Sequence, residues 1–295
     1  MSILPFDQRD GVIWMNGQIV PWRDARMHVL SHGLHYGGSV FEGERAYNGV
    51  IFKSREHSER FRTSAELLGF ELPYSVDELM AAKDAVIRAN GVRDVYVRPV
   101  AWRGSEMMAI SAQNATIHVA IATWEWPSMF DMATKMKGIR LDIAEYRRPD
   151  PQTAPSASKA AGLYMICTIS KHKAERKGYA DAMMLDWQGR VAECTGANIF
   201  FTRDGELHTP IADCFLNGIT RQTVIDLAKR RGIGVCERRI MPEELATFNE
   251  AFVCGTGAEV TPVSEIGPYK FTPGNISRTL IEDYAAEVTP KQPAF

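Results

Sequence analysis

The sequence has little cysteine, almost no net charge and no long apolar run. Its five cysteines are scattered without a C-x-x-C pair, so we expect reduced thiols in a cytosolic protein rather than a disulfide framework. The formal net charge of −2 gives no electrostatic reason to expect a nucleic-acid partner. No apolar stretch is long enough to span a bilayer. The first ten residues, MSILPFDQRD, carry acid and base together and are unlike a signal peptide.

Several common catalytic motifs are also missing. There is no G-x-G-x-x-G after a strand, no phosphate-binding P-loop and no G-x-S-x-G. His28, His32 and His35 lie close together, but no further cysteine, histidine or carboxylate stands at a familiar zinc spacing. Histidines that form hydrogen bonds are therefore favoured over a metal site.

What is present is the composition of an ordinary globular protein, with 45% hydrophobic and 24% charged residues over 295 positions. Turn-forming pairs between strand-like runs predict antiparallel hairpins at 16–17, 48–49, 188–189 and 204–205. Further strands are predicted at 94–102 and 116–124. Helices are predicted at 56–69, from the Ser75–Glu78 capping box to Gly91, at 163–177, and at 220–231 with Thr220 as a possible cap.

Strands that pair with near neighbours, with helices set among them, indicate an α+β fold rather than a doubly wound parallel sheet. The length suggests two domains. We expect a small N-terminal α/β domain at 1–125, an interdomain linker at 126–138 and a large C-terminal domain at 139–295. Segment 147–158, RRPDPQTAPSAS, is predicted to be a loop leading into Lys159, which the C-terminal domain would carry.

Lys159 is the first candidate for chemistry. Small neighbours in ASKAAG would let a flat ligand lie against the backbone, and a desolvated lysine amine is available for imine chemistry. The alternative is a solvated lysine beside a helix start.

Two glycine-containing segments are candidates for anion binding. Asn217–Thr220, NGIT, opens a predicted helix, where free N–H groups and the helix dipole suit a phosphate and Gly218 permits close approach. The turn Gly255–Gly257 exposes successive amides. An ordinary helix cap and an ordinary turn are the alternatives.

Two side-chain groups are candidates for charge recognition. Glu193 lies in a half-buried strand and needs a cationic partner, which is either a protonated ring nitrogen or an arginine of the chain. Tyr96 and Arg98 share one face of a strand. The guanidinium there either binds a carboxylate or reaches toward the sheet edge.

Several segments together resemble one enzyme family. SHGLHYGGSVFEGERAY, REHSERF, VYVRP, SKAAGLY, ECTGANIF, NGITR and CGTGAEVTPV occur in this order. They resemble the branched-chain amino acid aminotransferases of the fold type IV pyridoxal-phosphate enzymes, from about residue 12 to about residue 265. The resemblance implies a two-domain architecture like that of D-amino acid aminotransferase and a pyridoxal 5′-phosphate cofactor. It also implies ping-pong transamination between branched-chain L-amino acids and 2-oxoglutarate, and at least a homodimer.

The resemblance also implies roles for individual residues. Lys159 would form the Schiff base with the cofactor, Glu193 would pair with its ring nitrogen, and Tyr164 would hydrogen-bond its phenolic oxygen. The other implied cofactor residues, around the phosphate, are Arg60, Gly218, Ile219, Thr220 and Thr256. For the substrate, the resemblance implies Tyr96 and the amides of Thr256 and Gly257 at the α-carboxylate and Arg98 at the second carboxylate. It implies Tyr36 and Phe41 along the side-chain pocket and Ile110 from a neighbouring subunit. Met129 and Ala258 are further implied substrate residues.

The chain departs from the family pattern on the substrate side only. Met129 stands where the family usually has a tyrosine, and Glu106–Ala109 replaces a glycine-containing loop. A D-amino acid or (R)-amine transaminase and an aminodeoxychorismate-type lyase are alternatives with the same cofactor, and FEGERAY together with Tyr96 and Arg98 favours the L-branched-chain interpretation. A non-enzymatic relative is the remaining alternative, and the joint presence of Lys159, Glu193, Tyr164 and Arg60 argues against it.

Overall fold

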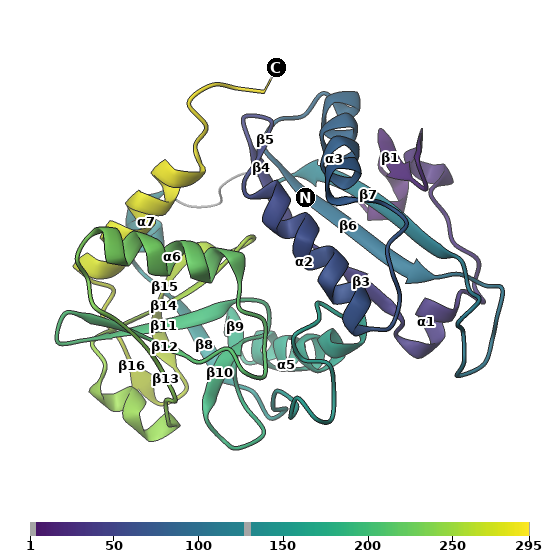
Figure 1. Ribbon diagram of the computed structural model, residues 1–295. Helices are drawn as coiled ribbons and strands as arrows, with labels where there is room; N and C mark the ends of the chain where they lie inside the picture. The colour runs from purple at the N-terminus through teal and green to yellow at the C-terminus, as the bar shows by residue number, and fades with distance from the viewer. Residues whose placement is uncertain (1–3, 127–130, 295) are drawn as a thin grey trace. The chain divides into compact units, whose positions relative to one another are not determined.

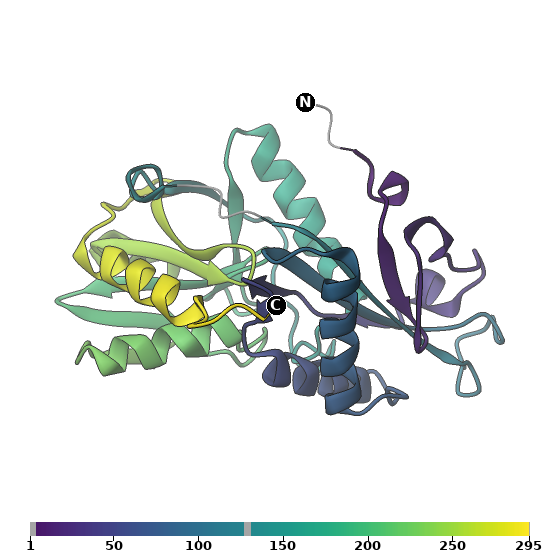
Figure 2. The same ribbon diagram turned by 90° about the horizontal axis from the view of Figure 1, so that it is seen from above.

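The structure is a computed structural model that describes residues 4–126 and 131–294. By compactness the chain divides into two units. Unit 1 comprises residues 1–127, 158–162 and 290–295, and unit 2 comprises residues 128–157 and 163–289. Each unit combines helices with a sheet of its own (Figures 1 and 2), so the predicted α+β class is confirmed.

Unit 1 is built on a seven-stranded sheet in the order β2-β1-β7-β6-β4-β5, with β3 also paired to β6. Helices α2 and α3 pack over one face of this sheet (Figure 1). The elements are η1 (Phe6–Gln8), β1 (Val12–Met15), β2 (Gln18–Pro21), η2 (Trp22–Asp24), α1 (His32–Tyr36), β3 (Ser39–Phe41), β4 (Glu44–Tyr47), β5 (Val50–Ile51), α2 (Ser54–Leu67), α3 (Val76–Asn90), β6 (Val95–Arg103) and β7 (Ile117–Glu125).

Alternation along β6 separates the core of unit 1 from its opposite face. Val95, Val97 and Ala101 are fully buried in the cluster that includes the apolar side chains of α2 and α3. Successive side chains of a strand point to opposite faces. Arg98 and Val100 therefore point away from these helices, toward the face where the cavity described below lies.

Unit 2 contains a nine-stranded sheet in the order β10-β9-β8-β15-β14-β11-β12-β13, with β16 also paired to β15. Helices α6 and α7 pack together against β14 and β15, and α5 packs against β8 and β9. The elements are α4 (Met132–Lys135), β8 (Ile139–Ile143), α5 (Met165–Arg176), β9 (Asp181–Leu185), β10 (Val191–Cys194), β11 (Asn198–Arg203), β12 (Glu206–Pro210), α6 (Ile219–Arg230), β13 (Val235–Arg238), η4 (Pro242–Thr247), β14 (Glu250–Gly255), β15 (Glu259–Ile266), β16 (Tyr269–Lys270) and α7 (Asn275–Val288). A short helix η3 (Ala161–Tyr164) contains the boundary between the units.

All four predicted hairpins are present, as β1–β2, β4–β5, β9–β10 and β11–β12. At the first of them Asn16 and Gly17 have φ of 50° and 89°. Positive φ at both central residues defines the type I′ turn, whose twist matches that of the flanking strands. The strands predicted at 94–102 and 116–124 are β6 and β7.

The four predicted helices are present as α2, α3, α5 and α6. In α3 the Ser75 hydroxyl accepts from the Glu78 N–H and the Glu78 carboxylate accepts from the Ser75 N–H, so the capping box is confirmed. The prediction of Thr220 as the cap of α6 is wrong. Gly218 is the N-cap, because its carbonyl accepts the first helical bond from Gln222.

The segment around Lys159 groups with unit 1, whereas the sequence placed it in a C-terminal domain at 139–295. Ala160 forms an antiparallel bridge with Val40, and Ser158 and Lys159 both bond to Ser64. The segment 147–158 contains no helix or strand, as predicted. Within the expected linker 126–138 the structure has the short helix α4.

Some further predictions concern the chain as a whole. All five cysteines are free thiols, in agreement with the prediction of reduced cysteines. Within residues 4–126 and 131–294, no helix has both the length and the apolar character needed to cross a membrane. Met129 lies outside the described residues.

Candidate active site

The backbone around Lys159 is held from two sides by unit 1. The Lys159 N–H donates to the Ser64 hydroxyl at 3.0 Å, and the Phe41 N–H donates to the Lys159 carbonyl at 3.1 Å. The Ser158 hydroxyl donates to the Ser64 carbonyl at 2.8 Å. The half-buried Lys159 amine lies 4.9 Å from the centre of the Phe41 ring. The structure therefore brings together the predicted lysine and one predicted wall of the side-chain pocket.

Arg60 lies on the same face of α2 as Ser64, one helical turn away. Its guanidinium donates two hydrogen bonds to Glu42, Nε to Oε1 at 2.7 Å and Nη2 to Oε2 at 2.8 Å. His57 Nδ1 lies 2.8 Å from Glu42 Oε2. Burial alone would raise the pKa of Glu42, but Arg60 and His57 outweigh it and hold the pKa well below its usual range. Arg60 is thus fixed one turn from the residue that anchors Lys159.

Tyr96 and Arg98 form the second predicted pair of unit 1. Arg98 Nη2 donates to the Tyr96 hydroxyl at 3.2 Å, and the guanidinium carbon lies 4.8 Å from the Phe41 ring centre. The Arg98 Nε is buried and has no hydrogen-bond partner in the described part of the chain. A buried donor without a partner costs free energy, which a bound carboxylate would remove. The predicted arrangement on one strand face is confirmed.

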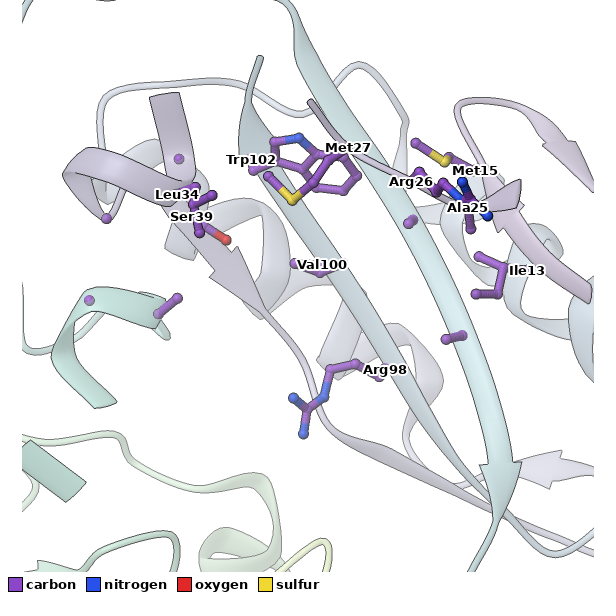
Figure 3. Close-up of a pocket in the computed structure, with 16 residues that line it drawn as sticks. Ile13, Met15, Ala25, Arg26, Met27, Leu34, Ser39, Arg98, Val100 and Trp102 are labelled. Atoms are coloured by element: carbon purple, nitrogen blue, oxygen red, sulfur yellow. The ribbon is translucent and has the colours of Figure 1, made fainter. Parts of the chain in front are cut away.

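Arg98 also stands at one end of a cavity of about 540 Å³ on the sheet face that α2 and α3 leave uncovered. Figure 3 shows Arg98 at one end of this cavity and Trp102 with Met27 at the other. The walls between them are mostly apolar. The lining residues are Ile13, Met15, Ala25, Arg26, Met27, Gly33, Leu34, Gly37, Ser39, Arg98, Val100, Trp102, Ala120, Ala122, Ala161 and Gly162.

Two predicted substrate residues of unit 1 are largely exposed. Tyr36 in α1 is 51% exposed and stacks on His32 at 4.6 Å between ring centres, and Ile110 is 88% exposed. Each of the three clustered histidines bonds to backbone atoms: His32 to the Ala109 carbonyl, His28 to the Leu30 N–H and His35 to the Val29 carbonyl. No group of three or more metal-ligating side chains gathers within the described residues.

In unit 2, Glu193 has an arginine partner inside the chain. Arg148 is 3% exposed, and its Nε lies 3.3 Å from Glu193 Oε1. Burial alone would lower the pKa of Arg148, but the charge of Glu193 and those of Cys167, Tyr164 and Cys214 together outweigh burial and raise the pKa. The register of β10 against β9 shifts between Val191 and Glu193, an irregularity of the kind that re-aims a side chain. Tyr164 is half-buried at the start of α5.

The two predicted anion-binding segments of unit 2 are the start of a helix and a turn, as predicted. Gly218 opens α6, a helix of 12 residues, and Ile219 and Thr220 lie buried in its first turn. The first N–H groups of a helix have no partner within the helix, which suits a phosphate. Thr256, Gly257 and Ala258 form the turn between β14 and β15.

Sequence reasoning missed the polar partners of the predicted residues, which are Glu42, Ser64, Arg148 and Asn198, whose amide Nδ2 donates to Glu193 Oε2 at 3.4 Å. Glu42 directly follows Phe41, and Asn198 ends the stretch ECTGAN that begins with Glu193. Position inside a recognised motif was therefore a usable signal for these two. Ser64 and Arg148 carried no comparable signal.

The chain is similar to known proteins over most of its length. The family model of amino-transferase class IV matches residues 39–266. The chain belongs to the class IV aminotransferase family. It is 46% identical to a probable branched-chain-amino-acid aminotransferase of Rickettsia felis, over 90% of both chains. It is 40% identical to the branched-chain-amino-acid aminotransferase of Pseudomonas aeruginosa, over 90% of this chain and 88% of that one.

Solved structures give the same family. The branched-chain aminotransferase of Thermoproteus uzoniensis with norvaline matches with a TM-score of 0.89 at 37% identity, covering 95% of both chains. The Escherichia coli enzyme matches with a TM-score of 0.91 at 35% identity, covering 97% of this chain and 98% of that one. The predicted family, fold type and enzyme class are confirmed. Class IV aminotransferases use pyridoxal phosphate, which confirms the predicted cofactor.

The residues of this aminotransferase fit that cofactor chemically. A primary amine at Lys159, a largely buried carboxylate at Glu193 and a helix N-terminus at Gly218 match the aldehyde, the ring nitrogen and the phosphate. Among the interpretations based on sequence, the comparisons favour the branched-chain aminotransferase over the D-amino acid, lyase and non-enzymatic alternatives.

Proposed function

We propose that this aminotransferase moves amino groups between branched-chain L-amino acids (leucine, isoleucine and valine) and 2-oxoglutarate. The observation that carries the proposal is Arg98, whose buried Nε lacks a partner in the described residues and stands at one end of a mostly apolar cavity wall. An apolar wall suits an aliphatic side chain, and a guanidinium at its end suits the second carboxylate of glutamate.

Relatives support this pairing of substrates. A branched-chain amino acid aminotransferase that is 38% identical to this chain has been solved with N-(5′-phosphopyridoxyl)-L-glutamate and with 4-methylvaleric acid. One of these ligands carries a side-chain carboxylate and the other a branched aliphatic chain. A site that accepts both needs an apolar wall with a cation at its margin, which is the chemistry that Phe41 and Arg98 offer here.

Cofactor binding is assigned to the residues that the family resemblance implies. Arg60, the backbone N–H groups of Ile219 and Thr220 and the hydroxyl of Thr256 would hold the phosphate. Glu193 would accept from the protonated ring nitrogen, and Tyr164 would donate to the phenolic oxygen. When bound to Lys159, pyridoxal phosphate supplies an electron sink that stabilises negative charge at the substrate α-carbon.

The protein's own residues would orient the substrate and move the proton. Tyr96 and the amides of Thr256 and Gly257 would hold the α-carboxylate. The Lys159 amine would then take the proton from the α-carbon as a general base. Two such half-reactions, one on each substrate, give ping-pong kinetics, in which the first product leaves before the second substrate binds.

We assign the exposed apolar side chains of unit 1 to an interface between two copies of this chain. Val29, Leu34 and Ile110 are 66%, 60% and 88% exposed, and the His32–Ala109 hydrogen bond joins the two segments that carry them. Exposed apolar patches of this kind mark interaction sites. Sedimentation should give at least a homodimer, and Ile110→Asp should weaken it. Val50→Asp, at a 39% exposed position on β5, is the matched control.

The remaining proposals concern domains and location. We propose that residues 1–125 and 139–295 are two domains joined by a linker at 126–138, and that limited proteolysis cuts first within that linker. We also propose that the enzyme works in the cytoplasm on free amino acids and 2-oxo acids. Cell fractionation that found the protein with membranes would contradict this location.

A visible absorption spectrum before and after adding L-leucine tests the central proposal. A yellow protein whose band shifts to shorter wavelength with L-leucine supports it. A yellow band that responds only to D-alanine or an (R)-amine would refute the substrate class while keeping the cofactor. Release of pyruvate from aminodeoxychorismate would instead identify a lyase.

A further inference from the structure

Asn198 is a buried side chain that joins two of the segments assigned to the cofactor. Its amide Nδ2 donates to Glu193 Oε2 at 3.4 Å and to the Leu216 carbonyl at 3.1 Å, and the residue is 6% exposed. Glu193 is the carboxylate assigned to the ring nitrogen. Leu216 lies two residues before Gly218, which opens the helix assigned to the phosphate.

The main chain of Asn198 lies beside the turn of Thr256, the third segment assigned to the cofactor. Asn198 pairs with Cys254 across β11 and β14, directly before the turn that contains Thr256. A tight bond from the Cys194 N–H to the Ala197 carbonyl, at 2.7 Å, closes the chain between Glu193 and Asn198. Residues assigned to the ring nitrogen, to the phosphate and to the Thr256 turn are thus connected through one asparagine.

Gly218 shows how closely the phosphate segment approaches this side chain. A Cβ added to Gly218 would lie 2.2 Å from Asn198 Oδ1, far inside a normal contact. The backbone of Gly218 has φ −59° and ψ 141°, a conformation open to any residue. Glycine is therefore required here by the asparagine and not by backbone strain.

We propose that Asn198 is a positioning residue that sets the separation between the Glu193 carboxylate and the phosphate-binding start of α6. The inference rests on the proposed cofactor roles of Glu193 and Ile219–Thr220. The ring nitrogen and the phosphate of the cofactor lie a fixed distance apart, so the protein groups that meet them must be held at a matching distance. A neutral amide suits this task because it donates to both sides without adding charge beside Glu193.

The test compares pyridoxal phosphate with pyridoxal, which lacks the phosphate. Apoprotein of the wild type and of Asn198→Ala is titrated with each compound, and the dissociation constants are read from absorbance. Asn198→Ala should raise the dissociation constant of pyridoxal phosphate about tenfold. The substitution removes the hydrogen bond to the charged Glu193 and also the fixed separation between Glu193 and the start of α6. The dissociation constant of pyridoxal should rise less than about threefold, because pyridoxal has no phosphate to be held at a matching distance.

A double-mutant cycle with Gly218→Ala gives a second, independent readout. When Asn198 is present, the methyl group added by Gly218→Ala clashes with it. Gly218→Ala alone should therefore weaken the binding of pyridoxal phosphate strongly. In the Asn198→Ala background the clash is gone, and the same substitution should cost much less. If Gly218→Ala reduced the affinity for pyridoxal phosphate equally in both backgrounds, the proposal would be overturned.

Asn90→Ala is the matched control. Asn90 also bridges three segments, through hydrogen bonds with Val12 and Thr123, but touches no residue assigned to the cofactor. It should lower stability and leave the ratio of the two dissociation constants unchanged. If Asn198→Ala does not fold, Asn198→Ser carries the same comparison, since a hydroxyl reaches at most one of the two partners.

The outcomes separate this inference from the proposed function. Wild-type protein that binds no pyridoxal phosphate would sink the proposed function itself. If the wild type binds pyridoxal phosphate normally and Asn198→Ala weakens the binding of both compounds equally, only the positioning role of Asn198 is refuted.

Discussion

Replacing Glu42 by glutamine should destabilise unit 1 because it removes the negative charge from a buried ion pair. Glu42 is fully buried, the Arg60 side chain is 18% exposed, and two hydrogen bonds of 2.7 and 2.8 Å join them. Glutamine keeps the size of the side chain but can accept through only one oxygen. The Arg60 guanidinium then stays largely desolvated and loses the negative charge of Glu42.

The magnitude follows from the burial of the pair. Removing one partner of a buried ion pair costs about 3–5 kcal/mol, and the retained oxygen of glutamine places Glu42→Gln near the lower end. Urea unfolding of the apoprotein at pH 7, followed by tryptophan fluorescence, measures this loss. Asp77→Asn is the matched control in unit 1. It removes the same charge from an exposed pair with Arg55, side chains 80% and 53% exposed, and should cost less than about 1 kcal/mol.

The pH dependence of the loss has a definite sign. The folded-state pKa of Glu42 is held below its usual value by Arg60 and His57 against the effect of burial. Its stabilisation is therefore complete above the unfolded-state pKa of about 4.3 and declines as pH falls from there toward the folded-state pKa. The difference between wild type and Glu42→Gln should shrink between pH 5 and pH 3. A loss no larger than that of Asp77→Asn, with no pH dependence, would refute the reasoning.

Four further substitutions test the proposed chemistry. Lys159→Ala should abolish transamination with an unchanged circular dichroism spectrum, and normal turnover would remove Lys159 from the mechanism. Glu193→Gln should lower kcat more than stability, measured by steady-state kinetics and urea unfolding. Arg98→Ala should reduce kcat/KM for 2-oxoglutarate at least tenfold more than for 4-methyl-2-oxopentanoate, because one bidentate carboxylate contact is lost; equal losses would contradict its role. Gly43→Ala should raise KM for both substrates, since its Cβ would lie 1.9 Å from the Tyr96 hydroxyl oxygen and displace it.

Local structure was predictable wherever one short signal decides it. The Asn16–Gly17 turn needs positive φ at both residues, and the Ser75–Glu78 box satisfies two orphan N–H groups, so each signal works without the rest of the fold. Helix α7 (Asn275–Val288) was not predicted. Its N-cap, Gly274, makes no side-chain cap bond, and Glu250 instead accepts from the N–H groups of this first turn. A cap supplied from 24 residues away leaves no local pattern.

The contacts that hold Lys159 on unit 1 could not be predicted for a related reason. Position in the chain placed it after the linker, among residues of the second unit. The bonds that decide the matter run to Ser64 and Phe41, about 95 and 118 positions earlier in the chain. Long-range bonds of this kind leave no periodicity in the sequence, so motif recognition identified the lysine but not its support.

Glycines show most clearly where motif reasoning and structure differ. The sequence suggested that Gly218 lets the backbone approach a phosphate, yet the space that its missing Cβ leaves lies against Asn198. Gly43 likewise leaves room for the Tyr96 hydroxyl, which bonds to Arg98. In both cases the glycine admits a polar side chain of the protein, which in turn fixes a charged residue of the site, Glu193 or Arg98. Each glycine therefore acts on the ligand indirectly, through the side chain that it makes room for. An alanine at Gly218 or Gly43 should be tolerated better when the neighbouring Asn198 or Tyr96 is replaced by a smaller residue. Enlarging the ligand pocket should not have this effect.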